Sequence, residues 1–185
     1  LSNVYTADHL FALRVVQEVA KKVTDVSKMR ALGFCVDIAH AELMTRTFNG
    51  RGIPSAMVSG ETRLQERDAR LRDLQAGALR CLFSVDLFNE GVDLPDVDTV
   101  LFLRPTESAT VFLSALGRGL RRADGKECLT VLDFIGSASR RFRFDHRYRA
   151  IIGGTRRIVE RAVERGFPSL PSGCAIQLDK QAQAT

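Results

Sequence analysis

The sequence lacks the features that mark membrane, secreted and metal-binding proteins. It has no run of roughly eighteen apolar residues, the length that a membrane-spanning helix needs. Its four cysteines stand far apart, so we expect neither a zinc motif nor a disulfide framework, but small buried thiols in a reducing cytoplasm. The three histidines are scattered, which predicts no metal set and no hydrolase triad.

Two further absences bear on nucleotide chemistry. No Gly-x-x-x-x-Gly-Lys-Ser/Thr loop occurs, because Gly125–Lys126 is followed by Glu127 and has no upstream glycine at the required distance. No Asp-Glu pair follows a predicted strand, so the usual carboxylates for magnesium and water activation are missing. The chain begins at Leu1, without an initiator Met or a signal peptide, and we therefore expect a fragment of a longer protein.

What is present is typical of one globular domain, with 185 residues of which 45% are hydrophobic and 26% charged. We expect this domain to span residues 1–170 and to be followed by a flexible tail over 171–185. Apolar residues recur at helical spacing, and short apolar β-branched runs alternate with them. The predicted helices are 7–24, 38–48 (capped by Asp37, ending at Asn49–Gly50), 62–75 (closed by Gly77), 108–120 and 148–163. The predicted strands are 30–36, 53–58, 80–85, 99–103 and 128–135. This order predicts an α/β fold, with a mainly parallel sheet and helices on both faces.

The positive charge is concentrated near the C-terminal end. Residues 138–165 hold nine arginines against three carboxylates, whereas the whole chain has a net charge of +5. This pattern favours a phosphate-bearing partner such as nucleic acid, with Arg156 and Arg157 as candidate contacts. A solvated helix face is the alternative. Gly153–Gly154 predicts a break or kink in that helix.

Two loops are candidates for chemistry, because ligands of parallel sheets bind beyond the carboxyl ends of the strands. The first loop is 86–95, in which Gly91 permits a tight turn and Asp93 can accept a hydrogen bond from a hydroxyl such as that of a ribose. An ordinary turn is the alternative for this loop.

The second loop is 116–122, where Arg118 and Arg121 stand three residues apart at a predicted helix end. Two such guanidinium groups suit a phosphate, because each donates bidentate hydrogen bonds and stays charged. Surface arginines favoured by the helix dipole are the alternative. Arginines for phosphate without a P-loop suggest half of a shared site.

Three blocks in order resemble the C-terminal RecA-like lobe of superfamily 2 helicases. The first is Ser59–Gly60 followed by Arg67–Asp68, the second is 84–95, similar to motif V, and the third is 114–121, similar to motif VI. The resemblance covers about residues 30–135, beyond which lies the basic segment 138–166. The amino-acid sequence of the second and third blocks looks most like that of bacterial DEAD/DEAH-type restriction and repair helicases.

The resemblance implies a RecA-like three-layer sandwich that serves as one lobe of an ATP hydrolase. ATP and Mg²⁺ would be shared with an N-terminal lobe of the same polypeptide, and this chain alone would be inactive. Arg121 would be the arginine finger and Arg118 would reach the phosphates or the other lobe, with no metal ligand in this chain. Gly91, Asp93 and Gly117 would bind ATP.

Nucleic acid is the implied partner of this lobe; DNA is favoured, and RNA stays open as the alternative. Ser59, Gly60 and Ser84 would contact its backbone without reading its sequence. Two departures affect single contacts: Ser114 replaces the usual Gln, and Val85 stands where many relatives have Thr.

Two rival functions remain at this point. One is a nucleic-acid-binding module without motor activity, and the other is a stand-alone nucleotide or sugar-phosphate enzyme on a doubly wound sheet. The missing Gly-rich strand-to-helix loop argues against the second.

Overall fold

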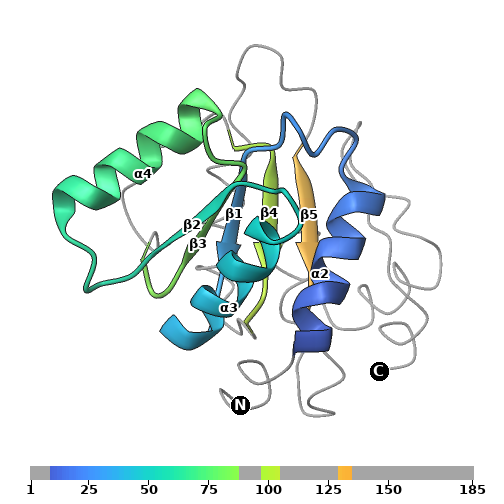
Figure 1. The fold of residues 1–185 in the computed structure, drawn as a ribbon, viewed down its shortest axis with the longest axis horizontal. Coiled ribbons are helices and arrows are strands. Elements are labelled where there is room, and N and C mark those ends of the chain that lie inside the picture. Colours follow the sequence, from blue (N-terminus) through green and yellow to red (C-terminus); the bar gives the residue numbers. More distant parts are fainter. Residues whose placement is uncertain (1–8, 88–96, 105–128, 135–185) are drawn as a thin grey trace, which may run out of the picture. The chain divides into compact units, whose positions relative to one another are not determined.

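The computed structural model describes residues 9–87, 97–104 and 129–134 (Figure 1). All of them belong to one of the two compact units into which the chain divides, made of 1–105 and 114–135. The described helices are α2 (His9–Lys22), α3 (Ile38–Asn49) and α4 (Leu64–Ala76). The described strands are β1 (Ala31–Phe34), β2 (Ser55–Val58), β3 (Cys81–Ser84), β4 (Thr99–Phe102) and β5 (Thr130–Asp133). None of the helices among these residues is long and apolar enough to cross a membrane.

The five strands form one sheet, and all of its neighbouring pairs are parallel. The strand order is β2-β3-β1-β4-β5, so β1 lies at the centre and Ala31 pairs with both Cys81 and Thr99. Parallel strands require crossovers, and helices supply those from β1 to β2 and from β2 to β3. The predicted α/β fold with a parallel sheet is therefore confirmed.

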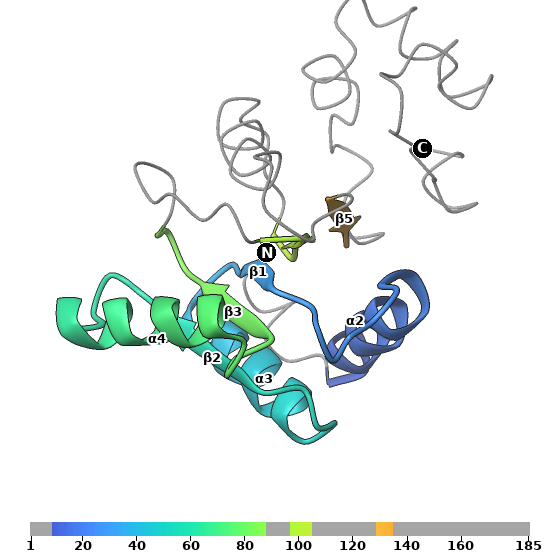
Figure 2. The same ribbon diagram turned by 90° about the horizontal axis from the view of Figure 1, so that it is seen from above.

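Helices α2 and α3 pack side by side against one face of the sheet (Figure 2). Alternate strand residues, including Ala31, Phe83 and Leu101, join apolar residues of both helices in one buried cluster. Val15 and Phe48 are the helical counterparts, and neither is exposed. This face is the main core of the described part. Each apolar side chain of this kind that is buried contributes about 1.5–3 kcal/mol to stability.

Helix α4 covers the opposite face. The connection from β1 to β2, which contains α3, runs toward the edge of the sheet, and the connection from β2 to β3, which contains α4, runs back toward its centre. Two right-handed crossovers that run in opposite directions place their helices on opposite faces of the sheet. Figure 2 shows α4 across the sheet from α3. On α4 only Leu74 is fully buried, and Phe34 and Phe102 stack at 5.6 Å between ring centroids among the alternate strand residues. Helices thus cover both faces, as predicted.

The helix limits follow local capping. Asp37 has extended backbone angles and accepts a hydrogen bond from the His40 N–H at 2.8 Å, which confirms it as the N-cap of α3. Gly77 ends α4 with φ of 76°, the left-handed conformation that glycine adopts without strain. The predicted helices 108–120 and 148–163 lie outside the described residues, and so the domain limits 1–170 and 171–185 remain predictions.

The edge strand β2 has its outward backbone groups occupied by side chains. The Asn49 amide bonds both the N–H and the C=O of Ser55, at 2.8 and 3.0 Å. The guanidinium of Arg70, which also pairs with Glu66, donates to the Met57 carbonyl. Exposed edges invite pairing with other strands, and here two side chains prevent it.

Gly33 on the central strand permits a close approach by a neighbouring ring. It pairs with Phe83 on β3, and a Cβ atom added at Gly33 would stand 2.7 Å from Cε1 of that ring. The ring has no exposed surface, because it also packs edge-on against Phe48 at 5.0 Å. It therefore has no free space into which it could withdraw.

We expect Gly33→Ala to lower the free energy of unfolding by about 1–3 kcal/mol, the usual cost of overpacking a core. Urea denaturation of the 185-residue chain measures it. Gly60→Ala is the matched control, because nothing lies within 4 Å of an added Cβ there, and its effect should stay within about 0.5 kcal/mol. Equal effects of the two substitutions would contradict the close approach.

Candidate functional site

The carboxyl ends of the parallel strands meet along one edge of the sheet, where ligands of such folds bind. Ser59 and Gly60 follow β2, Asp86 follows β3, Asp37 follows β1, and Arg104 follows β4. Polar and charged groups from four strands are thereby brought to one edge. Of the predicted site residues, the structure describes Ser59, Gly60 and Ser84.

Ser59 and Gly60 form a tight turn between β2 and α4. The Ser59 N–H donates to Thr62 Oγ1 at 2.9 Å, its carbonyl accepts from the Thr62 N–H at 3.0 Å, and its Oγ accepts from the Glu61 N–H at 3.3 Å. Ser59 is buried, whereas Gly60 is exposed and has open space beside it. The turn therefore fixes Ser59 internally and presents the backbone of Gly60 at the surface.

Ser84 lies inside the sheet. Only 1% of the residue is exposed, its hydroxyl donates to the Gly33 carbonyl at 3.4 Å, and its carbonyl accepts from the Cys35 N–H at 2.9 Å. The following residue, Val85, is also buried. In this arrangement Ser84 holds β3 against β1, and its contact with nucleic acid remains a prediction.

Asp86 and Arg104 form an ion pair that the sequence analysis did not find. Asp86 has φ of 52°, and no other non-glycine residue among those described has a positive φ. Its carboxylate pairs with the Arg104 guanidinium, whose side chain is only 17% exposed, against 73% for Asp86. Asp86 is the first residue of the candidate loop 86–95, and Arg104 follows a predicted strand directly. The two side chains meet because of the order of the strands in the sheet, and this order cannot be read from the sequence.

The ion pair spans the end of β1, because β3 and β4 flank that strand. Burial raises the pKa of the Cys35 thiol at this end, with a further rise from Asp37, while the charge of Arg104 opposes both. Burial also raises the pKa of Cys81. Both thiols are therefore protonated and unreactive, as expected for Cys35 and Cys81, and Cys128 and Cys174 lie outside the described residues.

His40 lies in the first turn of α3, beside the same edge, and is fully buried. Its Nδ1 accepts the Val36 N–H at 3.4 Å, which leaves Nε2 to carry the proton of the neutral ring. Burial lowers the pKa of His40 to about 4, although the nearby Asp37 carboxylate acts in the opposite direction. His40 is therefore neutral at physiological pH and supports the structure of this edge.

The His40 pKa predicts a loss of stability in acid. The unfolded chain binds this proton near pH 6.5, whereas the folded chain binds it only near pH 4, so stability falls as pH drops between these values. The loss is at most ~3 kcal/mol at about 1.4 kcal/mol per pH unit. Urea denaturation from pH 7 to pH 4 measures it, and His40→Gln should flatten this part of the profile. An unchanged slope in the variant would contradict the assignment.

The other predicted site residues lie outside the described residues. They are Gly91, Asp93, Gly117, Arg118, Arg121, Arg156 and Arg157. Within 9–87, 97–104 and 129–134 there is no group of three His, Cys, Asp or Glu residues that could hold a metal ion.

A parallel sheet of this order, covered by helices on both faces and carrying its polar loops at the carboxyl edge, defines a RecA-like lobe. The C-terminal domain of the DEAD-box protein Dbp5 has this fold, with a TM-score of 0.55 over 66% of this chain and 68% of that one, at 19% identity. The family described as the helicase conserved C-terminal domain matches residues 13–123, and the chain belongs to this family.

Two relatives with higher sequence identity agree with this assignment. The chain is 32% identical over 125 residues to the putative ATP-dependent helicase IRC3 of Saccharomyces cerevisiae, a match that covers 68% of this chain and 18% of the relative. It is 26% identical to a fragment of a putative HsdR subunit of a type I restriction enzyme from Vibrio vulnificus YJ016, with a TM-score of 0.60 over 75% of this chain and 28% of that one. The chain thus spans about a fifth of the length of the curated relative.

Proposed function

We propose that the chain is the second motor lobe of an ATP-dependent nucleic-acid helicase or translocase acting in the cytoplasm. The family match over residues 13–123 carries this proposal, because it spans the turn at Ser59, the ion pair of Asp86 and Arg104, and the Gly-Arg-x-x-Arg sequence that ends at Arg121. The missing P-loop supports a lobe that shares its ATP and Mg²⁺ with an N-terminal lobe of the same polypeptide.

In this proposal the lobe supplies positive charge to the transferred phosphate. Arg121 is the arginine finger, and Arg118 contacts the phosphates or the other lobe. Closure of the two lobes brings the guanidinium to the γ-phosphate, where charge develops during hydrolysis. Gly91, Asp93 and Gly117 complete the nucleotide contacts from this side.

Asp86 and Arg104 act as positioning residues for the nucleotide loop. The left-handed turn at Asp86 directs the chain out of β3, and its ion pair fastens the start of the loop to the end of β4. Gly91 and Asp93 follow within the same loop. A loop that is fixed at its root loses less entropy when it orders around a ligand.

Nucleic acid, DNA rather than RNA, is the proposed partner. Gly60 offers an exposed backbone in the turn that precedes α4, and the N-cap residue of this helix, Arg63, makes no side-chain cap hydrogen bond. The free N–H groups and the dipole at this end favour a phosphate. Ser59, Ser84, Arg156 and Arg157 are the further proposed contacts, and none of them implies recognition of base sequence.

The test is ATP hydrolysis by the complete protein and by the 185-residue chain alone. We expect the complete protein to hydrolyse ATP with strong stimulation by DNA, because motor lobes close on both ligands together. We expect the chain alone to show no hydrolysis above background, since it lacks the P-loop. Turnover by the isolated chain would favour a stand-alone enzyme, and DNA binding without any ATPase activity in the complete protein would favour a binding module.

A further inference from the structure

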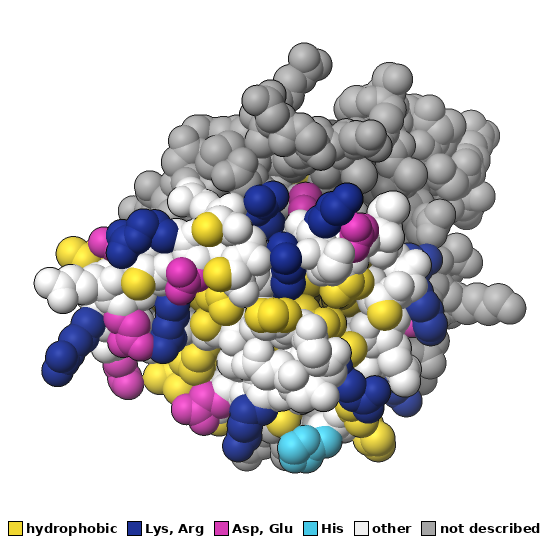
Figure 3. Space-filling view, turned by 45° about the horizontal axis from the view of Figure 1, so that its top comes forward, with side chains coloured by type: hydrophobic (Ala, Val, Ile, Leu, Met, Phe, Trp, Pro, Cys, Tyr) yellow, Lys and Arg dark blue, Asp and Glu magenta, His cyan; other side chains and the backbone are white. Residues whose placement is uncertain are grey.

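A groove lies at the opposite edge of the sheet, where the strands begin. It has a volume of about 690 Å³. Its walls come from α2, from the turn before β1, from the segment between α3 and β2, and from the residue before β3. The apolar wall residues are Val16, Ala20, Val26, Ile53 and Pro54. Figure 3 shows this face, where hydrophobic side chains gather in a hollow bordered by Lys and Arg.

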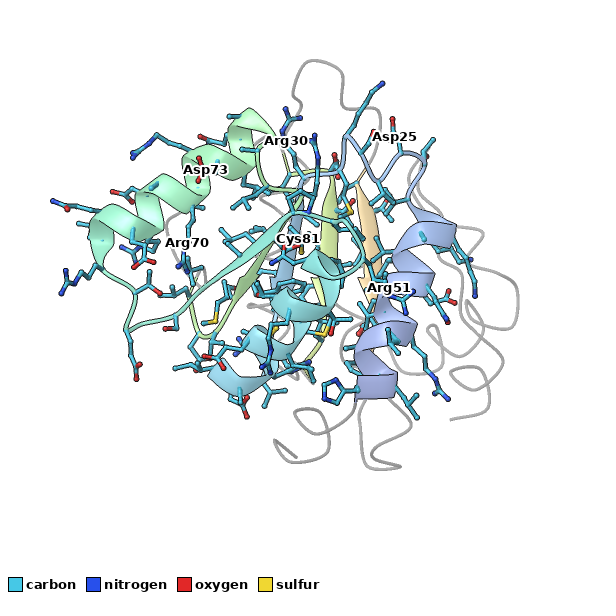
Figure 4. All side chains as sticks on the ribbon, in the orientation of Figure 1. Asp25, Arg30, Arg51, Arg70, Asp73 and Cys81 are labelled. Carbon is cyan, nitrogen blue, oxygen red and sulfur yellow. The ribbon has the colours of Figure 1, made fainter. Side chains whose placement is uncertain are left out.

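Arginines that have no carboxylate partner among the described residues border the groove. Arg51 and Arg80 line it, and neither makes an ion pair with any residue in the described part of the chain. Arg30 lies close by, and atoms of the Arg30 and Arg80 guanidiniums stand 3.9 and 3.0 Å from a single point, the position of a Cβ on Gly77. Figure 4 shows Arg30 near the end of α4 and Arg51 beside α2.

Two acidic residues near this edge, Asp25 and Asp98, have other partners. Asp25 accepts from the Ser27 N–H and hydroxyl and pairs with Lys28. The Asp98 carboxylate accepts from the backbone N–H of Arg30 and from the Thr99 hydroxyl. Among the described residues, the Arg30 guanidinium donates to the Gln75 carbonyl, at 3.0 Å, and makes no ion pair. The adjacent guanidiniums repel one another, and an anionic ligand would relieve this repulsion.

We propose that this groove docks a protein segment that carries carboxylates beside aliphatic side chains. Arginine binds carboxylate with two parallel hydrogen bonds, and the wall offers aliphatic surface for Leu, Ile or Val. Single-stranded nucleic acid is usually held by aromatic side chains that stack on its bases, and the groove lining contains none. Strand addition is blocked at the β2 edge by Asn49 and Arg70, so the segment binds through its side chains.

A random dodecapeptide display library, selected on the full 185-residue chain, tests the proposal. We expect the selected peptides to be rich in Asp and Glu next to Leu, Ile or Val. A synthetic peptide of the selected consensus should lose at least ten-fold in affinity to Arg51→Glu or Arg80→Glu, measured by fluorescence anisotropy. Ala20→Glu should have a similar effect, because Ala20 is exposed within the groove and the change adds both bulk and negative charge.

Arg72→Glu is the matched control, because Arg72 is an exposed arginine on α4 outside the groove lining. It should leave peptide affinity unchanged, and thermal melts should show that every variant folds. Selected peptides without acidic enrichment, or affinity insensitive to both groove arginines, would overturn the proposal. Displacement of the peptide by oligo-dT in the parent chain but not in Arg51→Glu would overturn it as well, since the groove would then belong to nucleic acid.

Discussion

Replacement of Arg121 by alanine in the complete protein is expected to lower kcat for ATP hydrolysis by at least ~10²-fold. An arginine finger acts mainly on charge that develops in the transition state, whereas the P-loop of the other lobe holds the ground-state nucleotide. The affinity for ATP should therefore change much less than kcat. Steady-state ATPase assays with saturating DNA, together with nucleotide binding measured separately, distinguish the two quantities.

Two companion variants sharpen this result. Arg121→Lys should recover little activity, because a point charge on a flexible stem does not reproduce the planar fork of a guanidinium. If Arg118 contacts the other lobe as well as phosphate, the effects of Arg118→Ala on kcat and on ATP affinity should differ from those of Arg121→Ala. Near-normal kcat in Arg121→Ala would refute the assignment and make Arg118 the next candidate.

Loss of the Asp86–Arg104 ion pair is expected to raise the KM for ATP about ten-fold in the complete protein, which is ~1.4 kcal/mol of binding free energy. Asp86→Gly keeps the left-handed turn and removes the carboxylate, while Asp86→Ala removes the carboxylate and strains the turn by about 1–2 kcal/mol. Alanine should therefore be the more damaging of the two. Arg104→Gln should match Asp86→Gly.

A purely structural role would instead lower the urea midpoint of the same variants. The positioning role predicts that Asp86→Gly scarcely changes this midpoint, because the Asp86 side chain is 73% exposed and such pairs contribute at most about 1 kcal/mol to folding. A double variant, Asp86→Gly with Arg104→Gln, should be no worse than either single one in KM. Additive losses, or an unchanged KM in all three, would contradict the positioning role.

Much of the fold could be predicted from the sequence because its signals are local. Asp37 caps a helix through a hydrogen bond to a residue three positions later, and Gly77 ends one through its own backbone angle. The apolar runs that became β1, β3 and β4 were visible as buried parallel strands, although the observed strands are a few residues shorter.

The candidate site was predictable only in part, because its contacts are long-range. The Ser59–Gly60 turn was found, since its residues are adjacent in the sequence. The pair of Asp86 and Arg104 was missed, because it depends on β3 and β4 flanking β1. Ser84 was assigned to a surface contact from its motif position alone, and its burial against Gly33 follows from the sheet register.

The position of β1 at the centre of the sheet has a consequence for the order in which the lobe assembles on the ribosome. This strand is made first, yet its neighbours β3 and β4 emerge only after α3, β2 and α4 have been synthesised. Contacts between residues far apart in sequence slow folding, and they leave an apolar strand unsatisfied while the chain grows. Ala31–Phe34 therefore lacks its neighbour β4 until residue 102 has left the exit tunnel. Helices α2 and α3 lie on either side of this strand in the sequence and pack together in the finished lobe, so they are the segments available to cover it before then.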